Sequence, residues 1–127
     1  MRLLLGIILI LITSCSEIFK TELPPIKDCT GDSDICSYAD SIQPIFNMYC
    51  TKCHGSQGGL DLTSYSGLLA GGQNGETIDD INFSNSLLLL RITDVNNPMP
   101  PPYEDEILDD IYTTMIAKWI QAGALDN

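Results

Sequence analysis

Positively charged residues are scarce in this chain. Its 127 residues include six Lys and Arg against 17 Asp and Glu, so the formal net charge at pH 7 is −11. Nucleic acids and anionic membrane surfaces attract basic proteins, and this charge balance argues against both as partners. An acidic surface favours solubility and steers a protein towards a partner with a basic docking surface. Simple colloidal repulsion is the alternative explanation of the charge.

Histidine and long apolar runs are scarcer still. His54 is the only histidine, which excludes any site that needs two histidines from the same chain. The longest apolar run, residues 3–12, is too short to span a bilayer, and it follows the basic Arg2. A short apolar run behind a basic residue is typical of a signal peptide, which we expect at residues 1–14.

The end of this run predicts where the chain is held. Residues 12–15 read Ile-Thr-Ser-Cys and resemble the lipobox of bacterial lipoproteins. On that resemblance, cleavage leaves Cys15 as a lipid-modified first residue, which anchors the protein to a membrane of the cell envelope, on the periplasmic side. An ordinary cleavage site beside a chance cysteine is the alternative.

Two segments follow the expected cleavage site. Residues 15–35 contain adjacent prolines and no apolar periodicity, which favours a flexible tether. Residues 36–127 form the predicted domain, with no internal repeats. Near their junction, Cys29 and Cys36 would close a short loop by a disulfide in an oxidising compartment. Two free thiols are the alternative.

The domain is predicted to be all-α, with long loops. Ser41 is a plausible N-cap for a first helix whose apolar face includes Ile45 and Phe46. Thr63 can cap a short helix through residue 69, and the leucines at 87–90 predict a buried helix within residues 82–93. A last helix begins between residues 104 and 109 and runs to about Gln121.

Residues 50–54 carry the strongest chemical signal, a Cys-x-x-Cys-His run. Two thiols at this spacing can each bond one vinyl group of the same porphyrin, and the next histidine can ligate its iron. Cys50 and Cys53 are therefore predicted to attach one covalent haem c, with His54 as the proximal ligand. Cys-x-x-Cys alone is weak evidence, because redox dithiols and half zinc sites share it, and it is the adjoining histidine that makes the signal for haem attachment strong.

The sixth ligand of such an iron has to be a methionine, an unusual group or none, because no second histidine exists. Met48 is too close in sequence to His54 to reach the opposite face easily, and Met115 lies on the apolar face of the last helix. Met99 lies in a proline-rich loop, and a stiff loop loses little entropy when it presents a thioether. We predict Met99 as the second axial ligand; the alternative is an apolar cover beside an open site.

Several features in order now resemble a known family. The Cys-x-x-Cys-His run, the glycines at 58–59 and 71–72, the Met99-Pro-Pro turn and the Trp-Ile-x-x-Gly-Ala ending resemble small monohaem class I cytochrome c domains of bacterial envelope lipoproteins. Such domains are frequent in Bacteroidetes- and Planctomycetes-type proteins. The resemblance implies a helical domain wrapped around the haem, with Trp119 near the crossing of the first and last helices. It also implies His54 and Met99 as axial ligands.

The function expected from these features is single-electron transfer between redox partner proteins in the envelope, not enzymatic catalysis. A five-coordinate haem c sensor or peroxidase-like domain is the second hypothesis, although no second histidine is available for acid–base chemistry. A non-haem lipoprotein in which Cys50 and Cys53 form a disulfide is the third.

Overall fold

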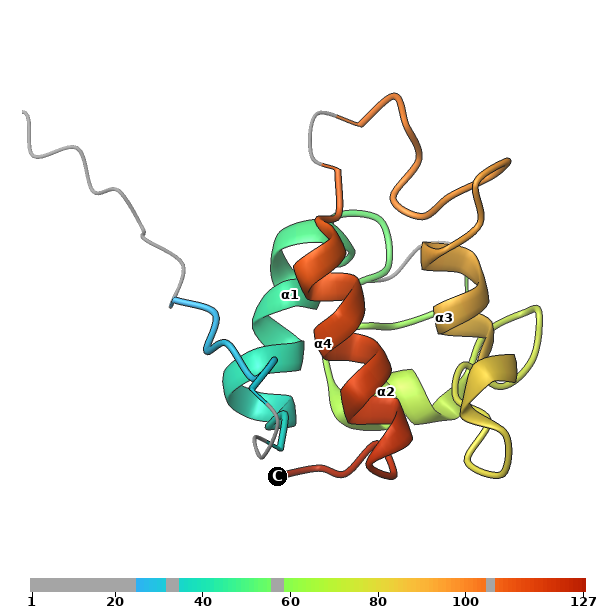
Figure 1. The fold of residues 1–127 in the computed structure, drawn as a ribbon. Helices are drawn as coiled ribbons and strands as arrows, with labels where there is room; N and C mark the ends of the chain where they lie inside the picture. The colour runs from blue at the N-terminus through green and yellow to red at the C-terminus, as the bar shows by residue number, and fades with distance from the viewer. Residues whose placement is uncertain (1–24, 32–34, 56–58, 105–106) are drawn as a thin grey trace, which may run out of the picture.

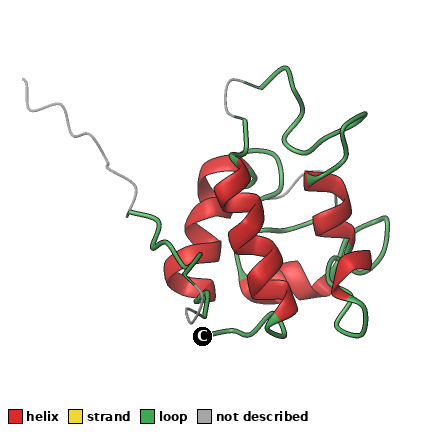
Figure 2. Cartoon of the chain, in the orientation of Figure 1, coloured by secondary structure: helices red, strands yellow, loops and turns green. Residues whose placement is uncertain are grey.

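The protein folds as a set of short helices joined by long loops. The structure, a computed structural model, describes residues 25–31, 35–55, 59–104 and 107–127. These ranges hold no β-strand, only an isolated bridge between Gly72 and Gly75, in agreement with the predicted all-α class (Figures 1 and 2). The helices, in chain order, are η1 (Tyr38–Ile42), α1 (Gln43–Tyr49), α2 (Tyr65–Ala70), η2 (Phe83–Asn85), α3 (Leu87–Ile92) and α4 (Asp110–Gln121).

The first helical segment begins earlier than predicted, because Ser37 and not Ser41 is its N-cap. Ser37 Oγ accepts the N–H of Asp40 at 3.3 Å, at the start of the π-helical turn η1, which continues directly into α1. Ser41 lies inside the helix, fully buried, and its Oγ donates to the carbonyl of Lys27 at 2.8 Å. Either serine fits the sequence pattern of a cap, and the contact with Lys27 is invisible in that pattern.

The second helix, α2, also has a different cap from the one predicted. Ser64 Oγ accepts the N–H of Gly67 at 3.1 Å, whereas the hydroxyl of Thr63 donates to Asp61 Oδ1 at 2.6 Å. The helix ends at Ala70, one residue past the predicted end, and Gly71 follows it with a φ of 73°, a left-handed conformation that glycine adopts readily.

The helix predicted within residues 82–93 exists but is short and only partly buried. The 3₁₀ turn η2 occupies Phe83–Asn85 and α3 starts at Leu87. Leu88 is 7% exposed, but Leu90 on the opposite side is 50% exposed. The leucine run therefore supplies one buried face, not a fully buried helix.

The last helix, α4, begins at Asp110, just past the predicted interval, and ends at Gln121 as predicted. Gly123 follows with a φ of 101°. The apolar face of α4 points inward: Met115, Ile116, Trp119 and Ile120 are buried, and Tyr112 is partly buried.

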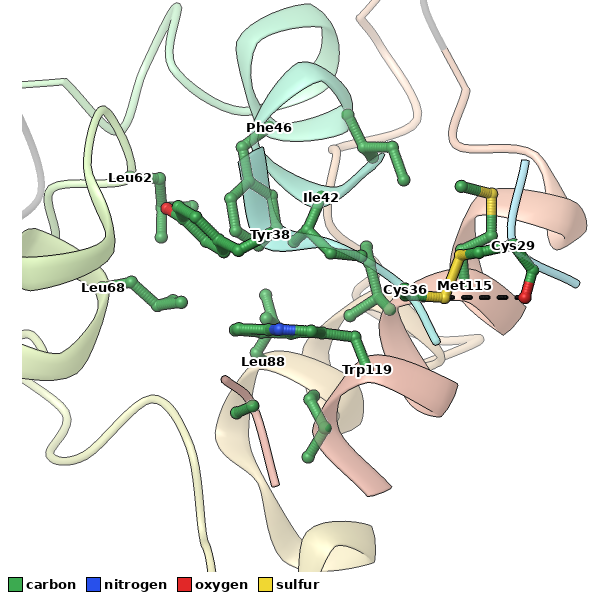
Figure 3. Packing of buried hydrophobic residues seen from close by; sticks show 14 residues of the cluster. Cys29, Cys36, Tyr38, Ile42, Phe46, Leu62, Leu68, Leu88, Met115 and Trp119 are labelled. Carbon is green, nitrogen blue, oxygen red and sulfur yellow. Dashed lines mark hydrogen bonds between the residues drawn. A yellow bond between two sulfur atoms is a disulfide. The ribbon is translucent and has the colours of Figure 1, made fainter. Parts of the chain in front are cut away.

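Trp119 lies at the centre of the core, where α4 meets η1 and α1 (Figure 3). Its ring centroid is 5.5 Å from that of Tyr38 on η1. The indole Nε1 donates to the carbonyl of Leu125 at 2.9 Å, so the buried N–H has a partner. The first and last helical segments therefore meet at Trp119, as the resemblance implied. Truncation of such a buried Trp to Ala costs about 3–5 kcal/mol.

Part of the predicted tether packs against the domain. Cys29 and Cys36 are joined by a disulfide, and both are buried in the core beside Met115 (Figure 3). Ile26 also packs against this cluster. The dashed contact from Cys36 Sγ to the carbonyl of Cys29 spans 3.7 Å, and because a disulfide sulfur carries no proton it is a close approach only.

The disulfide loop is further held by α4. Lys118 Nζ donates to the carbonyl oxygens of Cys29 at 3.0 Å and of Gly31 at 2.6 Å. The packed domain thus extends towards residue 26, beyond the boundary expected at residue 36. The expected signal peptide, residues 1–14, and Cys15 lie outside the described residues. Among the helices that are described, none has the length and apolar character needed to cross a membrane.

Candidate functional site

The Cys-x-x-Cys-His run forms a tight turn that continues the end of α1. The N–H of Cys50 donates to the carbonyl of Phe46 at 2.8 Å, as in a helix. The N–H groups of Cys53 and His54 then both donate to the carbonyl of Cys50, at 3.1 and 2.8 Å. Residues three apart in such a turn lie on the same side of the backbone, which brings the two thiols together as attachment to one porphyrin requires.

Two cavities border this turn, with volumes of about 460 and 360 Å³. Cys50, His54 and Met99 border both cavities, and Cys53 borders the smaller one. The fold therefore brings all four residues predicted to hold the haem to one region. Both volumes lie in the range of ligand-binding pockets.

The walls of the larger cavity divide by polarity. Apolar side chains come from α3 and from the segment after the turn, and polar ones come mainly from the loop before η2. The apolar residues are Leu60, Leu62, Leu87, Leu88 and Ile92, and the polar ones are Gln73, Asn74, Thr77 and Arg91.

His54 has a fixed backbone and an unsatisfied ring. Its carbonyl accepts the N–H of Leu62 at 2.7 Å, and its backbone N–H donates to the carbonyl of Cys50. Its ring Nδ1 is buried and has no hydrogen-bond partner among the described residues. An orphaned buried nitrogen is unusual, and at the edge of two cavities it fits a side chain that completes its interactions with a ligand.

The state of the two thiols distinguishes the candidate chemistries. Cys50 and Cys53 are free and not joined by a disulfide. Burial, together with the neighbouring Cys53, raises the pKa of the Cys50 thiol to about 12. Dithiol redox motifs work through a thiolate with a lowered pKa, so this environment is the opposite of what they need.

A zinc site has no support in the described ranges. No three His, Cys, Asp or Glu side chains gather there in an arrangement that could hold a metal ion. Two thiols, one imidazole and one thioether around a mainly apolar space instead fit a covalently held haem.

The three methionines considered as ligands have different environments. Met99 is partly buried and borders both cavities together with His54. Met48, two residues before Cys50 in the sequence, borders only the smaller cavity. Met115 is fully buried in the core and borders neither cavity.

Two features of this region were not predicted from the sequence. Arg91, at the end of α3, borders the larger cavity, and its carbonyl accepts the N–H of Met99 at 3.0 Å. Asp94 organises the loop between them through hydrogen bonds to Asn96 and Asn97. An Asp in a segment rich in Asn and Pro, here Asp94-Val-Asn-Asn-Pro, is a usual signal of an Asx turn, so this turn could have been found from the sequence.

Comparison with known proteins adds one match. Residues 50–103 match the family model described as Planctomycete cytochrome C, a segment that runs from the attachment turn through the Met99 loop. The match covers less than half of the chain. No curated protein and no solved structure matches this chain. A cytochrome c family implies covalently bound haem c and an electron carrier. The match supports a cytochrome c-type domain in this chain.

Proposed function

We propose that this protein carries single electrons through one haem c, attached by Cys50 and Cys53 and ligated by His54 and Met99. The observation that carries the proposal is that Cys50, His54 and Met99 border the same two cavities, although Met99 is distant in sequence. When bound, the haem supplies an iron centre that alternates between the ferric and ferrous states.

The protein's own residues would set the properties of that centre. Thioether ligation by Met99 favours ferrous iron and raises the reduction potential relative to a second histidine. Leu87, Leu88 and Ile92 of α3 would cover the porphyrin and exclude water, which lowers the local dielectric. With Met99 as the sixth ligand, the iron would have no free coordination site for a substrate, which favours electron transfer over catalysis.

The test is an absorption spectrum of oxidised and reduced protein produced with c-type maturation machinery, repeated after acid–acetone extraction. We expect sharp bands in the reduced state, colour that stays with the polypeptide, and no response to carbon monoxide. The Cys50→Ala/Cys53→Ala variant should lose all covalent colour. Absence of covalent haem in the unaltered protein would refute the proposal. Covalent haem that binds carbon monoxide readily would favour the five-coordinate sensor or peroxidase-like alternative.

We further propose that the domain works at a membrane of the cell envelope, held by lipid on Cys15, with redox partners that have basic docking surfaces. The sequence of residues 1–15 and the net charge of −11 support this arrangement. In fractionated cells, the Cys15→Ser variant should leave the membrane fraction while the unaltered protein stays in it. Membrane retention of the variant would count against lipid anchoring through this residue.

A further inference from the structure

The loop that leads from α3 to Met99 is organised by a single carboxylate. Asp94 Oδ1 accepts the N–H groups of Asn96 at 2.9 Å and of Asn97 at 3.2 Å. Its Oδ2 lies 3.6 Å from Arg91 Nη1, in the last turn of α3. The hydrogen bonds from these two backbone N–H groups hold the pKa of Asp94 below its usual range, and the carboxylate is ionised at neutral pH.

The same loop is closed by the backbone of Met99. Its N–H donates to the carbonyl of Arg91 at 3.0 Å, a carbonyl near the helix end that has no partner within the helix. Thr93 fixes the other end, since its N–H and hydroxyl both bond to the carbonyl of Leu89, at 3.1 and 2.8 Å. The position of Met99 therefore depends on a loop whose two ends both rest on α3.

We propose that Asp94 is a positioning residue for Met99: its carboxylate keeps this loop closed and so holds the thioether at the iron. The inference rests on the proposed function, because it takes Met99 as the axial ligand. Asp94 does not border either cavity and would act only through the loop. The hydrogen bonds from the Asn96 and Asn97 backbone N–H groups contribute most of this positioning. The ion pair with Arg91 contributes less, since it is long and the Asp94 and Arg91 side chains are both partly exposed.

The chain provides a matched control at Asp79. Its Oδ1 also accepts two backbone N–H groups, from Ile81 at 3.1 Å and from Asn82 at 2.8 Å. This turn leads into η2 and not to Met99, and Asp79 borders neither of the two cavities. Asp79→Ala therefore removes the same kind of turn without touching the Met99 loop.

The experiment compares the haem-loaded proteins in their ferrous state. Carbon monoxide binds only when the methionine has left the iron, so its apparent affinity reports the fraction of open sites. We expect Asp94→Ala to raise that affinity by about three- to tenfold and to weaken the sulfur-to-iron charge-transfer band of the ferric protein. Asp94→Asn keeps an oxygen acceptor without the charge, so its carbon monoxide affinity should lie between those of the unaltered protein and Asp94→Ala. Asp79→Ala should match the unaltered protein in both readings.

The outcomes separate this proposal from the proposed function. Equal carbon monoxide affinity in Asp94→Ala and Asp79→Ala would overturn the role of Asp94. If Asp94→Ala does not fold, Asp94→Asn is compared with Asp79→Asn by the same criterion. If Met99→Ala itself leaves the affinity unchanged, Met99 is not the ligand, and both proposals fail. If Met99→Ala opens the iron and neither Asp94 variant does, only the positioning role is wrong.

Discussion

Lys52 and Glu104 form an ion pair, with Nζ and Oε2 2.7 Å apart. Lys52 lies between the two cysteines of the attachment turn, and Glu104 follows the Met99-Pro-Pro segment. Both residues border the smaller cavity. The pair therefore connects the two segments that supply the proposed haem ligands, across 52 positions of sequence.

We predict that this connection contributes little to stability. The Lys52 side chain is 75% exposed, and exposed ion pairs contribute below about 1 kcal/mol. A double-mutant cycle with Lys52→Gln, Glu104→Gln and both together, followed by urea unfolding, isolates the energy of the pair from other contacts of either residue. The coupling energy should fall further at high salt. A coupling energy above about 2 kcal/mol would show that the pair is a structural clamp between the two segments.

The methionines should divide by role when each is changed to Ala. Met99→Ala should leave the haem attached and open the ferrous iron to carbon monoxide, with only a small loss of stability in the haem-free protein. Met115→Ala should leave carbon monoxide binding unchanged but cost about 2–5 kcal/mol of unfolding free energy, because Met115 is fully buried. Carbon monoxide titration and urea unfolding of the same variants check both statements. Opening of the iron by Met48→Ala in place of Met99→Ala would reassign the ligand.

The attachment turn could be read from the sequence because its chemistry is local. Cys50, Cys53 and His54 lie within one turn, so their spacing alone brings them together. The Met99 loop was predicted because its prolines exclude a helix, and the end of α4 because Gly123 follows it. Each of these signals lies within a few residues of the feature that it predicts.

Features that depend on tertiary contacts could not be read in this way. Ser41 has the sequence of an N-cap, but a contact with Lys27 places it inside the helix. Cys29 lies in a segment without periodicity, yet it is buried against α4, where Lys118 binds its carbonyl. The link between Met99 and Arg91 likewise appears only when the loop is folded back on α3.

Removal of the Cys29–Cys36 disulfide should destabilise the domain by about 2–3 kcal/mol, the value expected for so short a closed loop. The Cys29→Ala/Cys36→Ala variant tests this by urea unfolding. If the disulfide loop did not pack against the folded domain, the variant would keep its unfolding free energy, because the disulfide would then restrict the folded and unfolded chains equally. Lys118→Met serves as a companion variant: it keeps the disulfide but removes the bonds to the carbonyls of Cys29 and Gly31. We expect it to lose part of the same stability.

Tyr38 predicts how stability falls at alkaline pH. Burial, aided by the nearby Asp126, raises the pKa of its phenol from 10.0 to about 12. Between these two values the unfolded chain releases this proton while the folded chain keeps it. Ionisation therefore favours the unfolded state, and the contribution of Tyr38 to stability is complete below pH 10 and is lost as the pH rises towards 12.

The Tyr38→Phe variant isolates this effect. At pH 8 it should be less stable than the unaltered protein by about 1 kcal/mol, because the hydroxyl no longer donates to Gln43 Oε1. Phenylalanine does not titrate, so the difference should shrink steadily above pH 10 and can change sign before pH 12. Urea unfolding of both proteins at pH 8, 10 and 11 measures that difference, and alkaline effects at other sites cancel in it. A difference that stays constant across this range would mean that the phenol ionises equally in the folded and unfolded chains.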